Sequence, residues 1–140
     1  MYLIDTNVIS EARKGKAANP GVLAFFQQCL LQEQRIYLSV VTIGELRRGV
    51  DLIRHRGDAP QASRLQAWLD TVVGEYRDFI LSFDLDIAQA WGRLRVPSPE
   101  HALDKQIAAT ALIHDLTLVT RNVPDFQRTG VRLLNPFSDT

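Results

Sequence analysis

Short runs of apolar residues alternate along the chain with longer segments in which apolar residues recur every three or four positions. The short runs consist almost entirely of Leu, Ile, Val and aromatic residues, which is typical of strands covered on both faces of a sheet. They predict strands over residues 2–5, 36–41, 80–84, 117–121 and 131–134. The longer segments predict helices over residues 7–13, 20–33, 43–55, 60–77, 86–95 and 99–114.

This order of elements predicts the fold class. Strands that alternate with helices form parallel sheets with right-handed crossovers. The chain has 140 residues, 46% of them hydrophobic, which is enough for one domain with a core and too few for two. We therefore expect a single three-layer α/β domain over residues 1–140, with a central, mostly parallel five-stranded sheet flanked by helices.

Charge and composition exclude few functions. The 16 basic and 16 acidic residues balance, so any basic surface must be local, and the arginines of segment 47–64 are best explained as a solvated helix face. The single Cys29 lies in an apolar helical pattern, as expected in a reducing compartment. No segment has the signal-peptide pattern or the roughly 20 apolar residues of a membrane span. We expect a cytoplasmic protein without a membrane partner.

Polar residues follow several of the predicted strands. Asp5 ends the first strand in "YLIDTN", and Glu45 follows the second in "YLSVVTIGEL". Asp84 ends the third strand, and Asn122 and Asp125 follow the fourth. Ligands of open parallel sheets bind beyond the carboxyl ends of the strands. These side chains are therefore expected to face one end of the sheet.

Each of these residues also has a purely structural interpretation. Asp5 could cap the following helix, and Thr42 with Glu45 could form a capping box. Asp125 could be a turn residue after Pro124. For Asp84 the structural role is favoured, as the cap of the helix that begins near residue 86.

Asp104 is harder to explain by structure alone. Helical spacing places it on the same face as Ile107, Ala108 and Ala111, and its neighbour Lys105 points about 100° away around the helix. An ionised carboxylate on an apolar face is costly unless a cation compensates it. We therefore expect a functional role for Asp104.

Asp5 and Asp104, with Glu45 and a fourth polar group, are expected to hold a divalent metal. A set of ligands that contains only oxygen favours Mg²⁺ or Mn²⁺ over zinc. The three histidines lack the spacing of a zinc motif and are expected at the surface or at helix ends: His55, His101 and His114. A metal held by carboxylates is typical of phosphoryl chemistry, in which it activates water and neutralises the scissile phosphate.

Four segments carry a resemblance to a known family. They are "LIDTNVIS" at 3–10, "LSVVTIGELRRGV" at 38–50, "DKQIAATALIHDLTLVTRNVPDF" at 104–126 and "VRLLNPF" at 131–137. In this order they resemble the PIN-domain ribonucleases, and most closely the VapC and FitB type toxins of type II toxin–antitoxin systems. The resemblance covers essentially the whole chain and implies a PIN-like fold.

The resemblance also implies an activity and its partners. It implies a Mg²⁺- or Mn²⁺-dependent endoribonuclease, a hydrolase of RNA phosphodiester bonds. Such a toxin is usually a homodimer and is held inactive by a small antitoxin that blocks the acidic pocket. DNA would be reached only indirectly, through the antitoxin.

The resemblance also implies which residues of this sequence match the functional positions of the family. Asp5 and Asp104 match the metal-binding acids of the family and Glu45 its second acid, whereas Thr6, Asn7, Thr120 and Asn122 match positions that line the pocket. Relatives place the fourth acid at the position of either Asn122 or Asp125, and only Asp125 is acidic here. Pro124 disfavours helix at Val123, so we expect an extended turn with Asp125 facing the pocket.

Two other functions remain possible at this point. The "FDLD" sequence at 83–86 would suit a phosphatase of the haloacid dehalogenase type, but that class requires the acid pair after the first strand. A non-catalytic PIN-like module that binds RNA or an antitoxin is the second alternative. The three acids Asp5, Glu45 and Asp104 argue against it.

Overall fold

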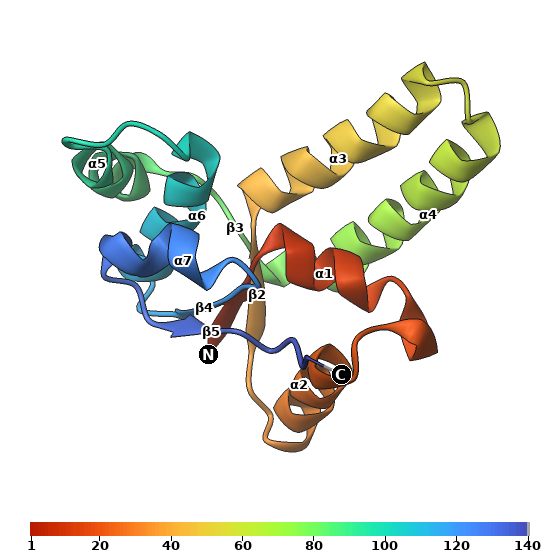
Figure 1. Cartoon of the computed structure of the whole chain (residues 1–140), viewed down its shortest axis with the longest axis horizontal. Coiled ribbons are helices and arrows are strands. Elements are labelled where there is room, and N and C mark those ends of the chain that lie inside the picture. Colours follow the sequence, from red (N-terminus) through yellow and green to blue (C-terminus); the bar gives the residue numbers. More distant parts are fainter. Residues whose placement is uncertain (140) are drawn as a thin grey trace.

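A computed structural model describes residues 1–139, and within them five parallel strands form one sheet (Figure 1). The strands are β1 (Tyr2–Ile4), β2 (Ile36–Ser39), β3 (Ile80–Leu81), β4 (Thr117–Val119) and β5 (Leu133–Leu134). Their order across the sheet is β3-β2-β1-β4-β5. The α/β class and the five-stranded parallel sheet predicted from the sequence are confirmed, with β3 at an edge.

The chain winds across the sheet in two directions from its central strand. From β1 it moves outward to β2 and β3, and it then returns to β4 on the other side of β1 before reaching β5. The strand order therefore reverses between β1 and β4. A crevice at the carboxyl ends of these two strands is the expected ligand site of such a sheet.

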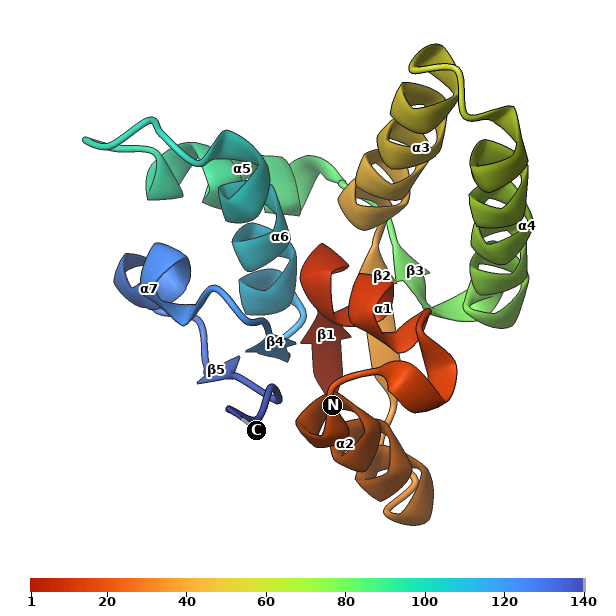
Figure 2. The same cartoon turned by 45° about the vertical axis from the view of Figure 1, so that its right-hand side comes forward.

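Helices cover both faces of the sheet. The helices α1 (Thr6–Ala12), α2 (Pro20–Leu31), α3 (Val40–His55) and α4 (Ala59–Glu75) lie on one face. The other face carries α5 (Leu85–Leu94), α6 (Ala102–Ile113) and the short α7 (Val123–Phe126). The helices α3 and α4 form a hairpin that projects away from the sheet (Figure 2).

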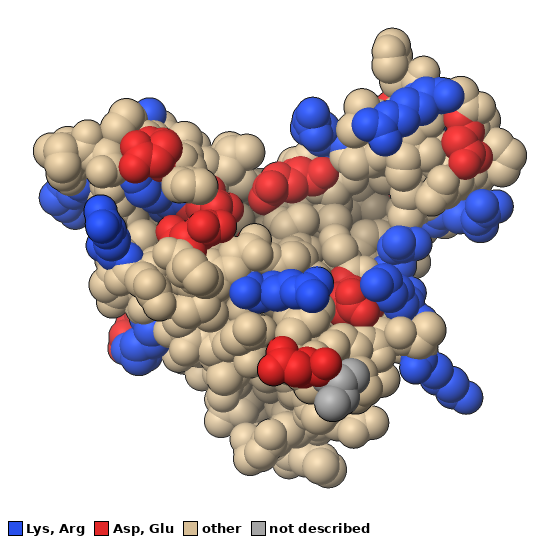
Figure 3. All heavy atoms as spheres, viewed as in Figure 1, with Lys and Arg blue, Asp and Glu red and all other residues tan. Residues whose placement is uncertain are grey.

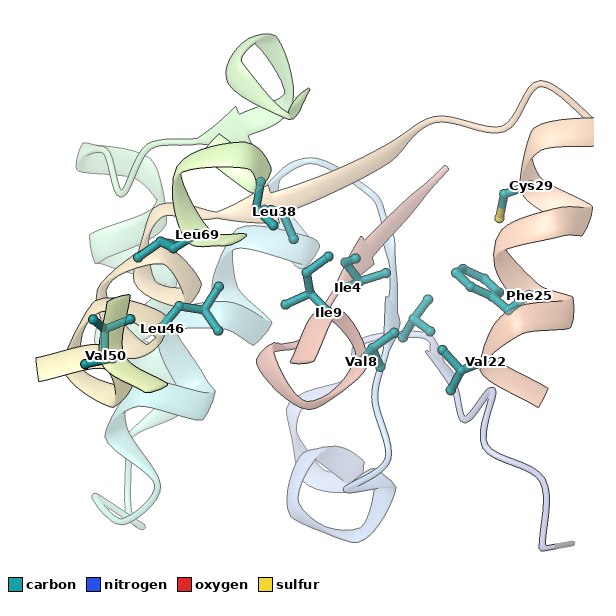
Figure 4. Packing of buried hydrophobic residues seen from close by; sticks show 13 residues of the cluster. Ile4, Val8, Ile9, Val22, Phe25, Cys29, Leu38, Leu46, Val50 and Leu69 are labelled. Carbon is teal, nitrogen blue, oxygen red and sulfur yellow. The ribbon is translucent and has the colours of Figure 1, made fainter. Parts of the chain in front are cut away.

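Apolar side chains of the strands point alternately to the two faces. Ile4 and Val119 pack with Val8, Phe25 and other residues of the α1–α4 face (Figure 4). The adjacent Leu3 and Leu118 belong to the core under α6 and α7. Both faces of β1 are thus buried, which explains why its sequence is continuously apolar up to Asp5.

The second predicted strand is too long, and the structure corrects the following helix start. Helix α3 begins at Val40, and the Ser39 hydroxyl caps it by accepting a hydrogen bond of 3.0 Å from the Val41 backbone N–H. The β-branched Val40 and Val41 favoured strand in the sequence, but a serine directly after a buried strand is a strong helix cap. The structural alternative in which Thr42 and Glu45 form a capping box is therefore excluded, because Thr42 lies inside α3 and Ser39 is the N-cap.

Other boundaries also differ from the prediction, and strands β3, β4 and β5 are shorter than the predicted ranges 80–84, 117–121 and 131–134. Helix α6 begins at Ala102 and not at residue 99, because His101 has a left-handed backbone conformation (φ 57°) that cannot continue a helix. The segment after β4 is the short helix α7 and not an extended turn. Pro124 lies at its start, where the missing N–H has no helical partner to lose.

The carboxyl-terminal segment is fastened to the start of α2. The side-chain oxygen Oδ1 of Asn19 caps α2 by accepting a hydrogen bond of 2.9 Å from the Gly21 N–H. It accepts another from the Ser138 N–H at 2.9 Å. Its side-chain amide NH₂ donates to the Ser138 carbonyl at 2.9 Å.

Among residues 1–139, no helix is both long and apolar enough to cross a membrane.

Gly21 tests this contact. A Cβ at Gly21 would lie 2.2 Å from the Pro136 carbonyl oxygen and 2.7 Å from the Ser138 nitrogen, both backbone atoms. Gly21→Ala should therefore lower the melting temperature, although alanine favours an unhindered helix by about 1 kcal/mol. Gly44→Ala is the matched control, because no atom lies within 4 Å of a Cβ there and this variant should melt at the same temperature or higher. If thermal denaturation showed that Gly21→Ala and Gly44→Ala raise the melting temperature equally, the predicted clash at Gly21 would be contradicted.

Candidate metal centre

Asp5 lies at the carboxyl end of β1, next to the point where the strand order reverses. Its side chain is only 4% exposed. One carboxylate oxygen accepts a hydrogen bond of 2.8 Å from the Thr6 N–H and so caps α1. The other accepts hydrogen bonds from the Thr120 hydroxyl at 2.8 Å and the Asn7 amide at 3.2 Å. Asp5 is thus both a helix cap and a carboxylate fixed at the crevice.

Thr120 and Asn7 connect the central strand to its neighbour. Thr120 follows β4 and is fully buried, and its hydroxyl also accepts a hydrogen bond of 3.0 Å from the Asn122 N–H. The side-chain oxygen Oδ1 of Asn7 accepts a hydrogen bond of 3.1 Å from the Arg121 backbone N–H. These contacts hold the ends of β1 and β4 in register at the crevice.

Glu45 reaches the same crevice from the first turns of α3. Its carboxylate accepts a hydrogen bond of 2.8 Å from the Thr6 hydroxyl, which also lies 3.2 Å from the Thr42 hydroxyl oxygen. Partial burial raises the pKa of Glu45, and the charge of Asp5 raises it further. Glu45 therefore faces α1 and Asp5, and not the backbone of its own helix.

Asp104 stands where the acids converge. Its side chain is 30% exposed, on the first turn of α6. Desolvation raises the pKa of Asp104 to about 6, with added repulsion from Asp5, Asp125 and Glu45. The neighbouring Lys105 points elsewhere and donates its ammonium hydrogen bond to the Ser98 carbonyl. A bound cation would relieve this crowding of negative charge.

Asp125 and His101 complete the group around Asp104. One potential ligand atom from each of His101, Asp104 and Asp125 lies within 4.8 Å of the other two. The imidazole Nδ1 of His101 is 3.8 Å from an Asp104 carboxylate oxygen. His101 was expected at the surface or at a helix end, and its position beside these two acids was not predicted. Its only signal was a position three residues before Asp104, which a helical turn can bring close.

Acidic side chains gather on both sides of the hollow that separates α6 and α7 from the start of α3 (Figure 3). A cleft of about 550 Å³ opens beside Asp125 and His101, and Lys105 and Arg128 also line it. Asp104 and Asp125 offer carboxylate oxygens within 4.8 Å of each other, and Asp5 and Glu45 lie near enough for their charges to raise the pKa of Asp104. Carboxylate oxygens suit a hard divalent cation such as Mg²⁺ or Mn²⁺. A polar cleft next to them could accept part of a phosphate-bearing chain.

Two candidate residues remain, Asp84 and Asn122, and Asp84 has a structural role as a helix cap. The Asp84 carboxylate accepts a hydrogen bond of 3.0 Å from the Ile87 N–H and caps α5, as predicted. It follows the edge strand β3, which leaves no support for a phosphatase site at residues 83–86. Asn122 is exposed at the start of α7, and its side chain makes no capping hydrogen bond.

Comparisons with known proteins agree with this architecture. The profile of the PIN domain family matches residues 2–131. The chain is 34% identical to Toxin FitB of Neisseria gonorrhoeae, over 99% of this chain and 100% of that protein. It is 30% identical to a VapC ribonuclease of Sinorhizobium fredii, over 98% of each protein.

Solved structures extend the likeness to three dimensions. The crystal structure of FitAcB from Neisseria gonorrhoeae superposes with a TM-score of 0.82 at 34% identity, covering 97% of this chain and 98% of that one. The structure of FitAB bound to a DNA fragment gives a TM-score of 0.83 at 31% identity, covering 100% and 98% of the two chains. The family profile, the relatives and the shared fold agree, and the chain is a member of the PIN domain family.

Proposed function

We propose that this chain is the toxin of a toxin–antitoxin pair and cleaves RNA as a metal-dependent endoribonuclease. Asp5, Glu45, Asp104 and Asp125 would hold the ion, Mg²⁺ or Mn²⁺, and Thr6, Asn7, Thr120 and Asn122 would line the pocket. We place the activity in the cytoplasm, where its RNA substrate would be. The family, and the ribonuclease and toxin names of its relatives, support this proposal.

The observation that carries the proposal is that three carboxylates, those of Asp5, Glu45 and Asp125, converge on a fourth, that of Asp104, and raise its pKa. The four come from the end of β1, from α3, from α6 and from α7. Packing alone does not favour such an arrangement, because each acid raises the free energy needed to ionise Asp104. A divalent cation fits the site, because it would turn this repulsion into attraction and because every one of these donors is an oxygen.

Each residue then has a chemical task. A divalent ion at this site would supply Lewis-acid stabilisation of the scissile phosphate and would favour deprotonation of an attacking water. The hydrogen bonds from the Thr6 N–H, the Asn7 amide and the Thr120 hydroxyl hold the carboxylate of Asp5 in one orientation before any ion binds. Glu45, on the opposite side of the hollow, is placed to accept a proton from water, and its raised pKa suits a general base.

The proposed partners follow from the relatives and from the shape of the α1–α4 face. A hollow of about 210 Å³ lies between α1, α3 and α4, and it runs from Thr6 and Glu45 over the apolar side chains of Leu46, Val50 and Trp68. An antitoxin segment in this hollow would reach the acids directly. We propose a homodimer that binds DNA only through such an antitoxin, as the FitAB complex with DNA suggests.

RNA cleavage by the purified full chain tests the function. With a fluorogenic RNA, we expect cleavage with Mg²⁺ or Mn²⁺ and none in EDTA. Asp104→Asn should lower the rate by about 10²-fold or more, because it removes a charged group of the centre but no helix cap. Asp84→Asn is the matched control, since asparagine caps α5 as well as aspartate and the rate should not change.

Two results would contradict this proposal. Cleavage by Asp104→Asn at the rate of the unaltered chain would exclude an acid-held catalytic metal. A chain that binds RNA or an antitoxin but never cleaves, with any of these ions, would show the non-catalytic binding module instead.

The crowded acids also predict a pH-dependent stability. The pKa of Asp104 is raised from 3.8 to about 6 in the folded chain, so the fold keeps a proton that the unfolded chain releases between these values. Stability without metal should therefore fall as pH rises from about 4 to 6. Asp104→Asn should melt higher than the unaltered chain in EDTA at pH 7, by on the order of 1 kcal/mol after solvent screening, and this gain should vanish near pH 4.

Thermal denaturation at several pH values, with EDTA or millimolar Mg²⁺, measures both the pH dependence of stability and the effect of Asp104→Asn on it. Mg²⁺ should raise the melting temperature of the unaltered chain more than that of Asp104→Asn. If Asp104→Asn melted lower in EDTA at pH 7, Asp104 would instead be stabilised by a cationic partner such as His101.

The fourth acid can be identified by comparing two neighbours. Both residues are exposed, but a carboxylate oxygen of Asp125 lies within 4.8 Å of one of Asp104, whereas the Asn122 side chain makes no capping hydrogen bond. Asp125→Asn should weaken metal binding or cleavage by roughly 10- to 100-fold, and Asn122→Ala should cost less. Metal titration and cleavage rates of both variants measure this order, and the reverse order would assign Asn122 to the site.

A further inference from the structure

We infer that the imidazole of His101 is a nitrogen ligand of the proposed metal centre, and that it makes the centre favour a divalent transition ion over Mg²⁺. This inference rests on the proposed function, because it assigns a further ligand to the same centre. It adds a donor of a different kind to a set that otherwise contains only oxygen.

The first observation is the backbone of His101. Among residues 1–139, three residues other than glycine have positive φ: Glu33, His101 and Asp115. Glu33 and Asp115 directly follow the C-caps of α2 and α6, where a left-handed residue commonly ends a helix. His101 instead precedes a helix, where extended backbone is usual, and its side chain makes no capping hydrogen bond. Helix termination therefore explains the other two conformations but not that of His101.

Neighbouring side chains hold this conformation in place. The Lys105 ammonium donates to the Ser98 carbonyl, and the Arg95 side chain donates to the Pro99 carbonyl at 3.3 Å. The Trp91 indole N–H donates to the Ala102 carbonyl at 2.9 Å. These contacts fix the backbone on both sides of His101 and so keep its main chain beside the first turn of α6, where the imidazole Nδ1 lies 3.8 Å from an Asp104 carboxylate oxygen.

The distances suit coordination by one ion. A potential ligand atom of His101 lies within 4.8 Å of one from Asp104 and one from Asp125. Two ligands on opposite sides of a small divalent ion, each about 2.1 Å from it, are about 4.2 Å apart. Small side-chain rotations would close the difference, and His101 is half exposed and free of a hydrogen bond that would resist them.

The imidazole nitrogen of His101 would determine which divalent ion the centre prefers. Mg²⁺ takes oxygen ligands almost exclusively and keeps much of its water, whereas transition ions accept imidazole nitrogen readily. A site with one imidazole among carboxylates should therefore bind Mn²⁺ more tightly, relative to Mg²⁺, than the carboxylates alone would.

Pulsed electron paramagnetic resonance of the full chain loaded with Mn²⁺ tests this directly, without RNA. The spectrum should show coupling of Mn²⁺ to a ¹⁴N nucleus, and ¹⁵N-labelled histidine should shift that signal. His101→Gly should abolish the coupling, and the ratio of Mn²⁺ to Mg²⁺ affinity from calorimetry should fall about tenfold or more. Glycine suits the positive φ, so this variant keeps the backbone unstrained.

His114→Gln is the matched control, since His114 is exposed at the far end of the same helix and this variant should keep both signals. If Mn²⁺ binds but the unaltered chain shows no histidine ¹⁴N coupling, or if His101→Gly retains it, the inference is overturned while the metal centre stands. If neither ion binds in calorimetry, the inference and the proposed metal dependence both fail.

Discussion

The hydrogen bonds that hold the carboxylate of Asp5 at the end of the central strand organise the crevice. Its oxygens accept them from Thr6 and Asn7 of α1 and from Thr120 after β4, so Asp5 joins β1, α1 and the end of β4 at one point. A buried carboxylate is tolerated only when such donors replace the water it loses. The position where the strand order reverses is thereby made rigid, and the crevice forms around it.

The remaining acids gather around this point at an energetic cost. Burial and mutual repulsion raise the pKa values of Asp5, Glu45 and Asp104, so the metal-free fold holds negative charge in an unfavourable place. The two apolar cores under the sheet offset this cost through burial of side chains such as Ile4, Leu118 and Phe126. The apolar cores thus supply stability that the acidic site does not, whereas Asp5 serves both, as the cap of α1 and as a proposed metal ligand.

The surroundings of the acids give the site two unequal sides. On the α6–α7 side, His101, Lys105 and Arg128 accompany Asp104 and Asp125 around a polar cleft. On the opposite side, Glu45 and Thr6 border a hollow with apolar walls between α1, α3 and α4. Polar walls suit a phosphate backbone and apolar walls suit a protein segment, so substrate and antitoxin could approach the same acids from different directions.

The sequence was enough to locate the strands along the chain and to single out Asp5 and Asp104. Continuous apolar runs revealed the strands because both faces of the sheet are buried, and helical spacing singled out Asp104 because a charge stood on an apolar face. The contacts that these residues make with distant segments are visible only in three dimensions. Glu45 faces Thr6 across the crevice, Asp125 lies close to Asp104, and His101 lies beside both through a left-handed backbone. Periodicity records which face of an element is buried, but contacts between distant segments depend on strand order and on loop conformation, and neither leaves a local pattern in the sequence.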